Sequence, residues 1–373
     1  MSALDVLGLR VSFGDHQVLQ GVDLRVEDGV TAVLGSSGCG KSTLLRTIAG
    51  FIEPSGGEVR LGGRTVTGGG ARSVPPRHRS IGYVPQEGAL FPHLDVAANI
   101  AFGLSRAVRA QRSGRRGRQA HDRVAAMLDL VELPHHLATR QPHELSGGQQ
   151  QRVAVARALA PGPDLVLLDE PFSSLDAGLR EETGRAVVRA LRAAGAAALL
   201  VTHDQGEALS LADQVAVMAQ GRFLQVDTPL GVYLEPADAA VATFLGHAAV
   251  VPGTTNGGGT ASCLVGPLPL KGEHPAGPVL LAIRPEQVEV TRAEQPGGAR
   301  DGERDGQTPP AGVLATVIDA SFFGHDATVR VQVDGHPEIL TARTPADSVP
   351  QTGDRVLVQV TGEVLGFPGQ VAP

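Results

Sequence analysis

Several residue types are scarce in this 373-residue sequence, and each scarcity argues against a class of site or segment. Only two cysteines occur, Cys39 and Cys263, without the spacing of a disulfide framework or a zinc site, which is typical of a reducing cytosolic compartment. No stretch approaches the ~18 uninterrupted apolar residues of a membrane-spanning helix. Residues 1–10 mix charged and short apolar side chains, unlike a signal peptide. We therefore expect any work at a membrane to depend on docking onto other subunits.

The sequence also has no excess of positive charge, and it contains almost no lysine. The formal net charge is −7 and the pI is near 5.9, so no nucleic-acid partner is expected and wholesale binding to anionic lipid is not indicated. Of the 32 basic residues, only Lys41 and Lys271 are lysine. A lysine at a motif position in such a chain indicates a role that a planar guanidinium cannot fill.

The chain is long enough for two folded domains, and the first shows the pattern of an α/β fold. Three compact apolar runs end in glycine or polar residues, as in strands covered on both faces of a parallel sheet. They are Val30–Leu34, Leu165–Leu168 and Ala198–Val201. Ligands of such sheets bind at the carboxyl ends of the strands, where we expect the functional site.

A long helical stretch, at about 90–160, lies between the first two runs. It contains an arginine-dense segment, Arg106–Arg118, for which a solvated helix face is favoured over contact with membrane headgroups or a partner. This pattern predicts a helical subdomain within a domain that spans residues 1–240.

The pattern changes after residue 246 to an apolar alternation of period 2. This alternation predicts a second domain at 247–373, a small all-β barrel. Residues at about 292–312 have almost no large apolar side chain, and we predict that they form a disordered insertion.

The strongest motif runs from Gly35 to Ser42 and matches G-x-x-x-x-G-K-[ST] between a predicted strand and a predicted helix at Lys41–Ala49. Its glycines let backbone N–H groups surround phosphate oxygens at the helix N-terminus. Lys41 is placed to contact the β- and γ-phosphates of ATP, and the Ser42 hydroxyl to coordinate Mg²⁺. The predicted ATP-binding residues of this loop are Gly35, Ser36, Ser37, Gly38, Cys39, Gly40, Lys41, Ser42 and Thr43.

An acidic pair, Asp169 and Glu170, follows the second apolar run. A carboxylate at a strand end can hold Mg²⁺, which we predict for Asp169, and Glu170 is placed to orient or polarise the attacking water. Alone, this pair would also suit a structural ion pair. Together with the phosphate loop it predicts a P-loop ATPase.

The octapeptide Leu145–Arg152 narrows the class, because it carries Leu-Ser-Gly-Gly-Gln. Ser146 is a good helix N-cap, and Gly147 and Gly148 leave helix N–H groups uncovered, which makes a second anion site together with Gln149. One chain cannot easily bring this site to its own phosphate loop. A head-to-tail homodimer would close each ATP between the two.

On these motifs, residues 4 to about 240 resemble the ATP-binding cassette family. The resemblance implies an α/β P-loop NTPase with ATP and Mg²⁺ as cofactors, and it assigns four further residues. Gln86 corresponds to the glutamine that contacts Mg²⁺ and water, Asp176 to the D-loop at the dimer seam, and His203 to the switch histidine that contacts the γ-phosphate. Phe13 would stack on adenine, although a phenylalanine in a strand core is an alternative.

Leu281–Glu286 resembles the signature of the transport-associated OB-like (TOBE) domain of import ATPases, which helps to hold their homodimer together and can carry regulatory ligands. It implies two transmembrane permease subunits, an extracytoplasmic solute-binding protein, and a peripheral location at the cytoplasmic face of the cell membrane. The segments Gln86–Leu94 and Phe322–Asp326 resemble ferric-iron import ATPases. Import of spermidine/putrescine, sulfate or thiamine is the alternative to import of ferric iron. A soluble ATPase of translation or repair is less favoured, because the chain has one cassette and no sustained heptads.

Overall fold

The computed structural model describes residues 2–70, 72–86, 90–104, 115–293 and 312–369, with side chains omitted at 115–118. Two compact units, Met1–Glu235 and Pro236–Pro373, are described separately. The division lies a few residues before the expected boundary near 240. Most of the predicted insertion at 292–312, and of the arginine-dense segment at 106–118, falls outside the described residues.

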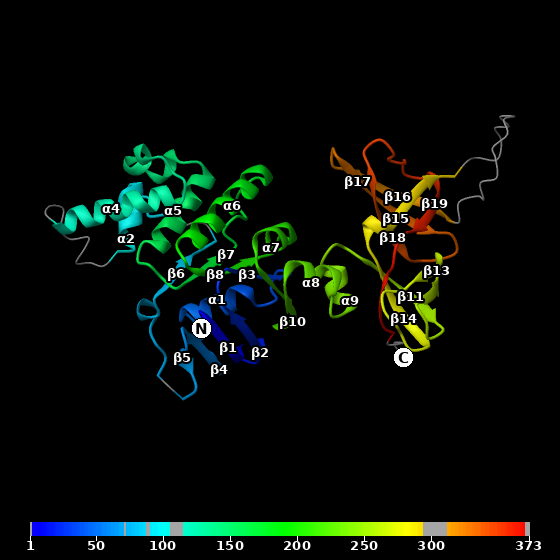
Figure 1. The fold of residues 1–373 in the computed structure, drawn as a ribbon, viewed down its shortest axis with the longest axis horizontal. Coiled ribbons are helices and arrows are strands. Elements are labelled where there is room, and N and C mark those ends of the chain that lie inside the picture. The colour runs from blue at the N-terminus through cyan, green and yellow to red at the C-terminus, as the bar shows by residue number, and fades with distance from the viewer. Residues whose placement is uncertain (1, 71, 87–89, 105–114, 294–311, 370–373) are drawn as a thin grey trace. The chain divides into compact units, whose positions relative to one another are not determined.

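A six-stranded sheet in the order β10-β9-β3-β8-β7-β6 forms the centre of the first unit (Figure 1). All neighbouring pairs are parallel except β9 and β10. Parallel strands buried on both faces need continuous apolar sequence, which the three predicted runs supply. The strands are β3 (Val30–Gly35), β6 (Ile81–Val84), β7 (Leu165–Asp169), β8 (Ala197–Thr202), β9 (Gln214–Ala219) and β10 (Arg222–Asp227).

An antiparallel sheet in the order β2-β1-β4-β5 accompanies it. Its strands are β1 (Leu4–Phe13), β2 (His16–Val26), β4 (Gly56–Leu61) and β5 (Arg64–Gly68). The described helices of the unit are α1 (Lys41–Ala49), α2 (Val96–Phe102), α4 (Arg115–Leu130), α5 (Gly147–Leu159), α6 (Ala177–Ala193), α7 (Gln205–Leu211) and α8 (Pro229–Leu234), with short 3-10 turns at Pro76–His78, His135–Thr139 and Pro142–Glu144. None of the helices in the described ranges combines the length and the apolar content needed to cross a bilayer.

The two faces of the six-stranded sheet are covered by different helices (Figure 1). In β7, Leu165 and Leu167 share a core with α1 and the antiparallel sheet. Val166 and Leu168, which point the other way, share a core with α2, α4, α5 and α6. The helix after the phosphate loop and the helix that begins at the Leu-Ser-Gly-Gly-Gln motif therefore pack on opposite faces.

The helical layer is fastened to its entry loop by one buried side chain, Asn99. The amide nitrogen of Asn99 donates to the carbonyl oxygens of Phe91, Leu94 and Asp95 at 3.2, 2.9 and 3.0 Å. Its amide oxygen accepts from the backbone nitrogen of Phe91 at 2.8 Å. Since Asn99 is fully buried, these bonds satisfy groups that would otherwise be costly to remove from water.

The second unit consists almost entirely of strands. One five-stranded sheet has the order β13-β12-β11-β14-β20, and a second has the order β15-β19-β16-β17-β18, whose edge strands β15 and β18 pack together, so that this sheet curls. The elements are α9 (Ala239–Phe244), β11 (Ala249–Thr255), β12 (Thr260–Cys263), β13 (Gly266–Pro269), β14 (Gly277–Ile283), β15 (Val288–Arg292), β16 (Val313–Phe322), β17 (Asp326–Val333), β18 (Ile339–Pro345), β19 (Arg355–Val360) and β20 (Leu365–Pro368), with a 3-10 turn at Pro285–Gln287.

Candidate nucleotide-binding site

The phosphate loop joins the fully buried strand β3 to helix α1, as the motif predicts. Gly38 and Gly40 have φ angles of 80° and 110°, a region that side chains disfavour. Lys41 is only 5% exposed, and its Nζ donates to the carbonyl oxygens of Gly35 and Ser36 at 2.7 and 2.9 Å. The ammonium is thus held inside the loop, at the N-terminus of α1.

Gly35 is required by the close approach of a neighbouring strand. A Cβ built on it would lie 2.4 Å from the carbonyl oxygen of Met218 in β9 and 2.6 Å from the Cys39 sulfur. Backbone atoms cannot move away cheaply, so only glycine lets the loop begin here. Cys39 itself is buried and forms no disulfide.

Ser42 and Asp169 meet although they are far apart in the sequence. The Ser42 hydroxyl donates to Asp169 Oδ1 at 3.0 Å, and the hydroxyl of Tyr83, on β6, donates to Oδ2 at 3.2 Å. Burial, with a contribution from the Asp169 carboxylate, raises the pKa of Tyr83 to about 12. A hydroxyl and a carboxylate held together are hard oxygen donors that suit Mg²⁺.

Glu170 follows β7 and is contacted by two residues from other segments. Its Oε2 accepts from Gln86 Nε2 at 3.3 Å and lies 3.2 Å from His203 Nδ1, just after β8. The φ angle of Glu170 is 45°, a conformation that costs a non-glycine residue about 1–3 kcal/mol and is found preferentially at functional sites. Two predicted catalytic residues, Gln86 and His203, therefore converge on the carboxylate of a third, Glu170.

The signature segment caps helix α5. The Ser146 hydroxyl accepts from the Gln149 backbone nitrogen at 3.3 Å, and the Gln149 side-chain oxygen accepts from the Ser146 nitrogen at 3.0 Å. Asp176 caps the next helix, α6, by accepting from the Leu179 nitrogen at 3.0 Å. Helices α5 and α1, which begin at the signature segment and at the phosphate loop, pack on opposite faces of the sheet.

Phe13 lies at the end of β1, at the turn into β2, and is 54% exposed. Strand β2 borders the phosphate loop, since a Cβ on Gly40 would lie 2.9 Å from the Leu19 side chain. The ring of Phe13 is therefore on the surface and is not a core side chain. This exposure argues against the alternative of a strand-core phenylalanine, and adenine stacking stays a prediction.

Sequence reasoning missed Tyr83 and three residues beside the switch histidine, Arg180, Asp204 and Glu207. The hydroxyl of Tyr83 is bonded to Asp169, and the other three bond to one another. No motif spacing marks any of them. Only the apolar alternation along β6 could have indicated that the Tyr83 side chain lies on the same face of the sheet as Leu165 and Leu167 of β7.

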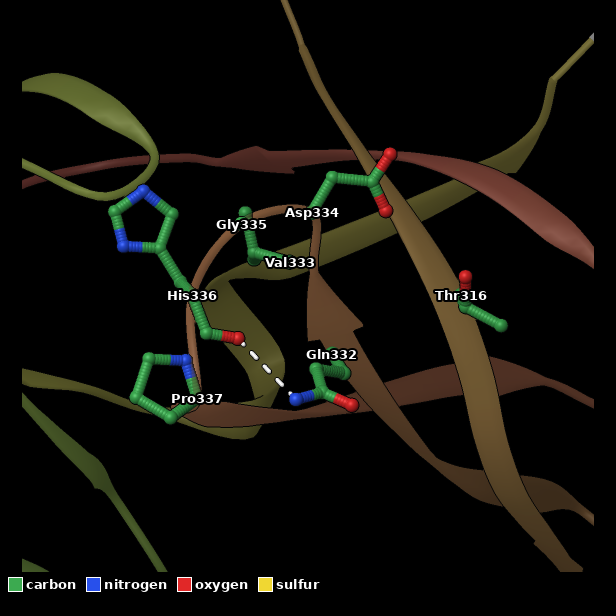
Figure 2. A pocket seen from close by; sticks show the side chains of 7 residues that line it. All are labelled: Thr316, Gln332, Val333, Asp334, Gly335, His336 and Pro337. Atoms are coloured by element: carbon green, nitrogen blue, oxygen red, sulfur yellow. Dashed lines mark hydrogen bonds between the residues drawn. The ribbon is translucent and has the colours of Figure 1, made fainter.

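A separate hollow lies in the second unit and contains none of the nucleotide motifs. Figure 2 shows its lining, with Gln332 donating to the His336 carbonyl oxygen at 3.2 Å. Its carboxylate, Asp334, is engaged by Arg355, whose Nη1 lies at 2.7 Å, and this pairing holds the pKa of Asp334 below its usual value. The lining residues are Thr316, Gln332, Val333, Asp334, Gly335, His336 and Pro337.

Comparison with known proteins decides the family. A profile described as ABC transporter matches residues 19–173, and a TOBE domain profile matches residues 281–365. The Fe(3+) ions import ATP-binding protein FbpC 3 of Rhodococcus jostii (strain RHA1) is 44% identical over 370 residues, which cover 98% of this chain and 99% of the relative. The chain belongs to the ABC transporter ATP-binding proteins.

Another relative and two solved structures of this ABC protein's family support the same assignment. The Fe(3+) ions import ATP-binding protein FbpC of Pseudomonas fluorescens is 45% identical over 372 residues, covering 98% of this chain and 99% of the relative. Among solved structures, cbiO1 of Clostridium perfringens, part of the transporter complex cbiONQ, has a TM-score of 0.56 and 29% identity, covering 63% of this chain and 92% of that chain. The dimeric ATP-binding cassette MJ0796, bound to ADP and Pi, has a TM-score of 0.51 and 28% identity, covering 61% of this chain and 98% of that chain.

The predicted fold class is confirmed: an ABC-type P-loop ATPase followed by a TOBE domain made of strands. The ABC protein accordingly binds nucleotide and belongs to the class that couples ATP hydrolysis to transport.

Proposed function

We propose that two copies of this chain form a homodimeric ATPase that powers the import of ferric iron through an ABC transporter. The observation that carries the ATPase part is the convergence of Gln86 and His203 on Glu170, beside the Ser42–Asp169 pair. The relatives named for Fe(3+) import, which align over nearly the whole chain, support the solute.

In this proposal, Glu170 is the catalytic carboxylate. Its Oε2 accepts a hydrogen bond from the attacking water and takes up a proton as the water oxygen bonds to the γ-phosphorus. The bond between the γ-phosphorus and the oxygen that bridges it to the β-phosphate breaks, so that ADP leaves and phosphate is formed. Gln86 and His203 both contact Oε2 of that carboxylate, and His203 also contacts the γ-phosphate in this proposal. Lys41 exchanges its bonds to loop carbonyls for bonds to the phosphates, where a compact charge is required.

ATP is held by Phe13 on the adenine and by the backbone of residues 35–43 on the phosphates. Ser42, Asp169 and Gln86 would hold Mg²⁺, which neutralises charge between the β- and γ-phosphates when bound. The partner copy supplies Ser146, Gly147, Gly148, Gln149 and Asp176. The packing of α5 and α1 on opposite faces of the sheet supports this sharing, because one chain cannot easily bring both segments to one ATP.

The proposed assembly contains two such ATPase subunits at the cytoplasmic face of the cell membrane. They contact two transmembrane permease subunits through the segment that follows Gln86, and the permease contacts an extracytoplasmic solute-binding protein. The proposed role of the second unit is to enlarge the dimer interface.

Glu170→Gln tests the ATPase part. The amide keeps the size of the side chain but cannot accept the proton, so we expect ATP turnover to fall by at least ~10³-fold. ATP should then trap a dimer that size-exclusion chromatography detects. The matched control is Arg185→Met, which removes an exposed charge pair on α6 and should behave as wild type. Normal turnover by Glu170→Gln would contradict the role given to this residue.

A transport assay tests the solute. Cells that lack the gene are complemented with the wild-type chain or with Glu170→Gln, and uptake of radiolabelled ferric iron, spermidine, putrescine, sulfate and thiamine is compared. We expect only the wild-type chain to restore uptake, and only of ferric iron. If the wild-type chain restored the uptake of another solute instead, that solute would replace ferric iron in the proposal, and the proposed ATPase activity would be unaffected.

A further inference from the structure

Arg180 connects two loops of the site that are distant in the sequence. It lies in the first turn of α6, the helix that Asp176 caps, and its backbone nitrogen donates to the Asp176 carbonyl oxygen at 2.9 Å. Its Nη2 donates to the carbonyl oxygen of Leu175, in the D-loop, at 3.0 Å. Its Nη1 donates at 2.9 Å to Oδ2 of Asp204, the residue after His203. One guanidinium therefore binds both the D-loop and the switch segment.

Glu207, on α7, anchors the other side of His203. Glu207 is 6% exposed; its Oε2 accepts from the Thr202 hydroxyl at 2.6 Å, and its Oε1 lies 3.8 Å from Arg180 Nε. Asp204 donates from its backbone nitrogen to the Thr202 hydroxyl oxygen at 3.0 Å. The residues before and after His203 are thus both bonded to the Arg180–Glu207 pair.

The hydrogen bonds and ion pairs around Arg180 fix the positions of the two loops more than they stabilise the fold. A half-buried ion pair gains little net free energy, because desolvation offsets the attraction, but removing one partner leaves a costly unpaired charge. The guanidinium is a planar fork that can bind two oxygens in fixed directions, which a lysine ammonium cannot reproduce. The arrangement therefore constrains where His203 and the D-loop lie with respect to each other.

We propose that Arg180 is a positioning residue, which ties the switch segment around His203 to the D-loop so that the two loops reach ATP in one movement. The inference rests on the proposed ATPase function, in which His203 contacts the γ-phosphate and Asp176 lies at the dimer seam. Arg180 does not contact the phosphate loop through any of its described bonds. Its loss should consequently lower kcat and leave the binding of ATP to the loop nearly unchanged.

The test compares three variants on helix α6. Arg180→Met keeps the length of the stem and removes the fork, and Arg180→Lys keeps the charge but only one bond. Arg185→Met is the matched control, because Arg185 pairs with Glu181 at 2.6 Å on the exposed side of the same helix, with both side chains 63% exposed. Steady-state ATPase kinetics and the thermal midpoint are measured for each purified full-length chain.

We expect kcat of Arg180→Met to fall by at least about tenfold, the order of loss that misplaced catalytic groups cause, with KM for ATP within about twofold of wild type. Arg180→Lys should recover part of kcat, and Arg185→Met should match wild type. Asp204→Asn provides an independent arm, since the amide still caps α7 but loses the charge that Arg180 binds. Its kcat should fall in the same way.

Two results would overturn the inference. In the first, kcat of Arg180→Met and of Asp204→Asn both stay within about twofold of wild type. In the second, kcat of Arg180→Met falls only in proportion to its folded fraction, measured from its thermal unfolding curve, which would make the network merely structural. A wild-type chain without ATPase activity would instead refute the proposed function and this inference with it.

Discussion

Gly148, in the signature segment, occupies a position where a side chain would collide with a neighbouring helix. A Cβ built there would lie 2.6 Å from Thr183 Oγ1 on α6 and 3.3 Å from Leu179 Cγ. Thr183 is buried and β-branched, so rotation about χ1 exchanges its hydroxyl for its methyl group and offers little relief. The two helices can approach this closely only because residue 148 is glycine.

We expect Gly148→Ala to lower the free energy of unfolding by about 1–3 kcal/mol, the usual cost of overpacking. This cost outweighs the gain of at most about 1 kcal/mol from replacing glycine in a helix. In a Thr183→Ala background the obstructing oxygen is gone, and the sign reverses. There, Gly148→Ala should be neutral or should stabilise the fold by up to about 1 kcal/mol.

The assay is urea unfolding followed by the helical far-ultraviolet circular dichroism signal, to which the first unit contributes nearly all the described helices. Gly178→Ala is the matched control, because Gly178 is also the second residue of a helix and a Cβ there would meet only Asp176 Oδ1, at 3.8 Å. That control should be neutral or stabilising. An equal effect of Gly148→Ala in the two Thr183 backgrounds would refute the steric reasoning.

Three further outcomes are expected. Asn99→Ala removes the amide that binds the carbonyl oxygens of residues 91, 94 and 95, and it should cost about 1–3 kcal/mol in urea unfolding; an unchanged midpoint would contradict this. Burial, with a contribution from Asp169, raises the pKa of Tyr83 to about 12, above the value of ~10 that a tyrosine has in an unfolded chain. The neutral hydroxyl therefore contributes its full stabilisation below pH ~10, and this contribution is lost as the pH rises to about 12. Tyr83→Phe should abolish a step in phenolate absorbance near that pH, and persistence of the step would assign it elsewhere. Ser42→Ala should weaken the binding of Mg²⁺ with nucleotide by roughly tenfold or more in calorimetric titration, because one oxygen ligand is lost, whereas unchanged affinity would exclude Ser42 as a ligand.

The strands and the helix that carry the nucleotide motifs were predictable because local sequence determines them. The runs at Val30, Leu165 and Ala198 become β3, β7 and β8, and the predicted helix at Lys41–Ala49 is α1. Continuous apolar residues suit no other place in a soluble domain so well as a sheet covered on both faces. The roles of the site residues at the ends of these strands remain predictions; the structure shows that Ser42 bonds to Asp169 and Gln86 to Glu170.

The second unit shows where alternation fails as a guide. The apolar alternation runs along Val279–Val290, but a 3-10 turn at Pro285–Gln287 interrupts this segment, because proline cannot donate to the ladder. Strand β16 continues to Phe322, beyond the apolar alternation of Val313–Val317, because a register shift between Val317 and Asp319 changes which side chains face inward. Strand β13, with Pro267 and Pro269, has no pattern of its own.

Arg180, Asp204 and Glu207 could not be predicted for a different reason. Each is an ordinary polar residue on a helix or at its cap, and in a single sequence nothing separates it from a solvated side chain. Their bonds connect α6 with α7 and depend on how these helices pack. Such contacts arise only from tertiary structure.

The burial of Lys41 has a practical consequence for handling the protein. Its ammonium lies against two carbonyl oxygens inside the phosphate loop, whereas the other lysine of the chain, Lys271, is exposed on the second unit. An amine-selective dye or surface linker therefore meets one accessible lysine, outside the nucleotide site, apart from the terminal amine. The chain can be labelled or immobilised through that lysine while its ATP chemistry is measured.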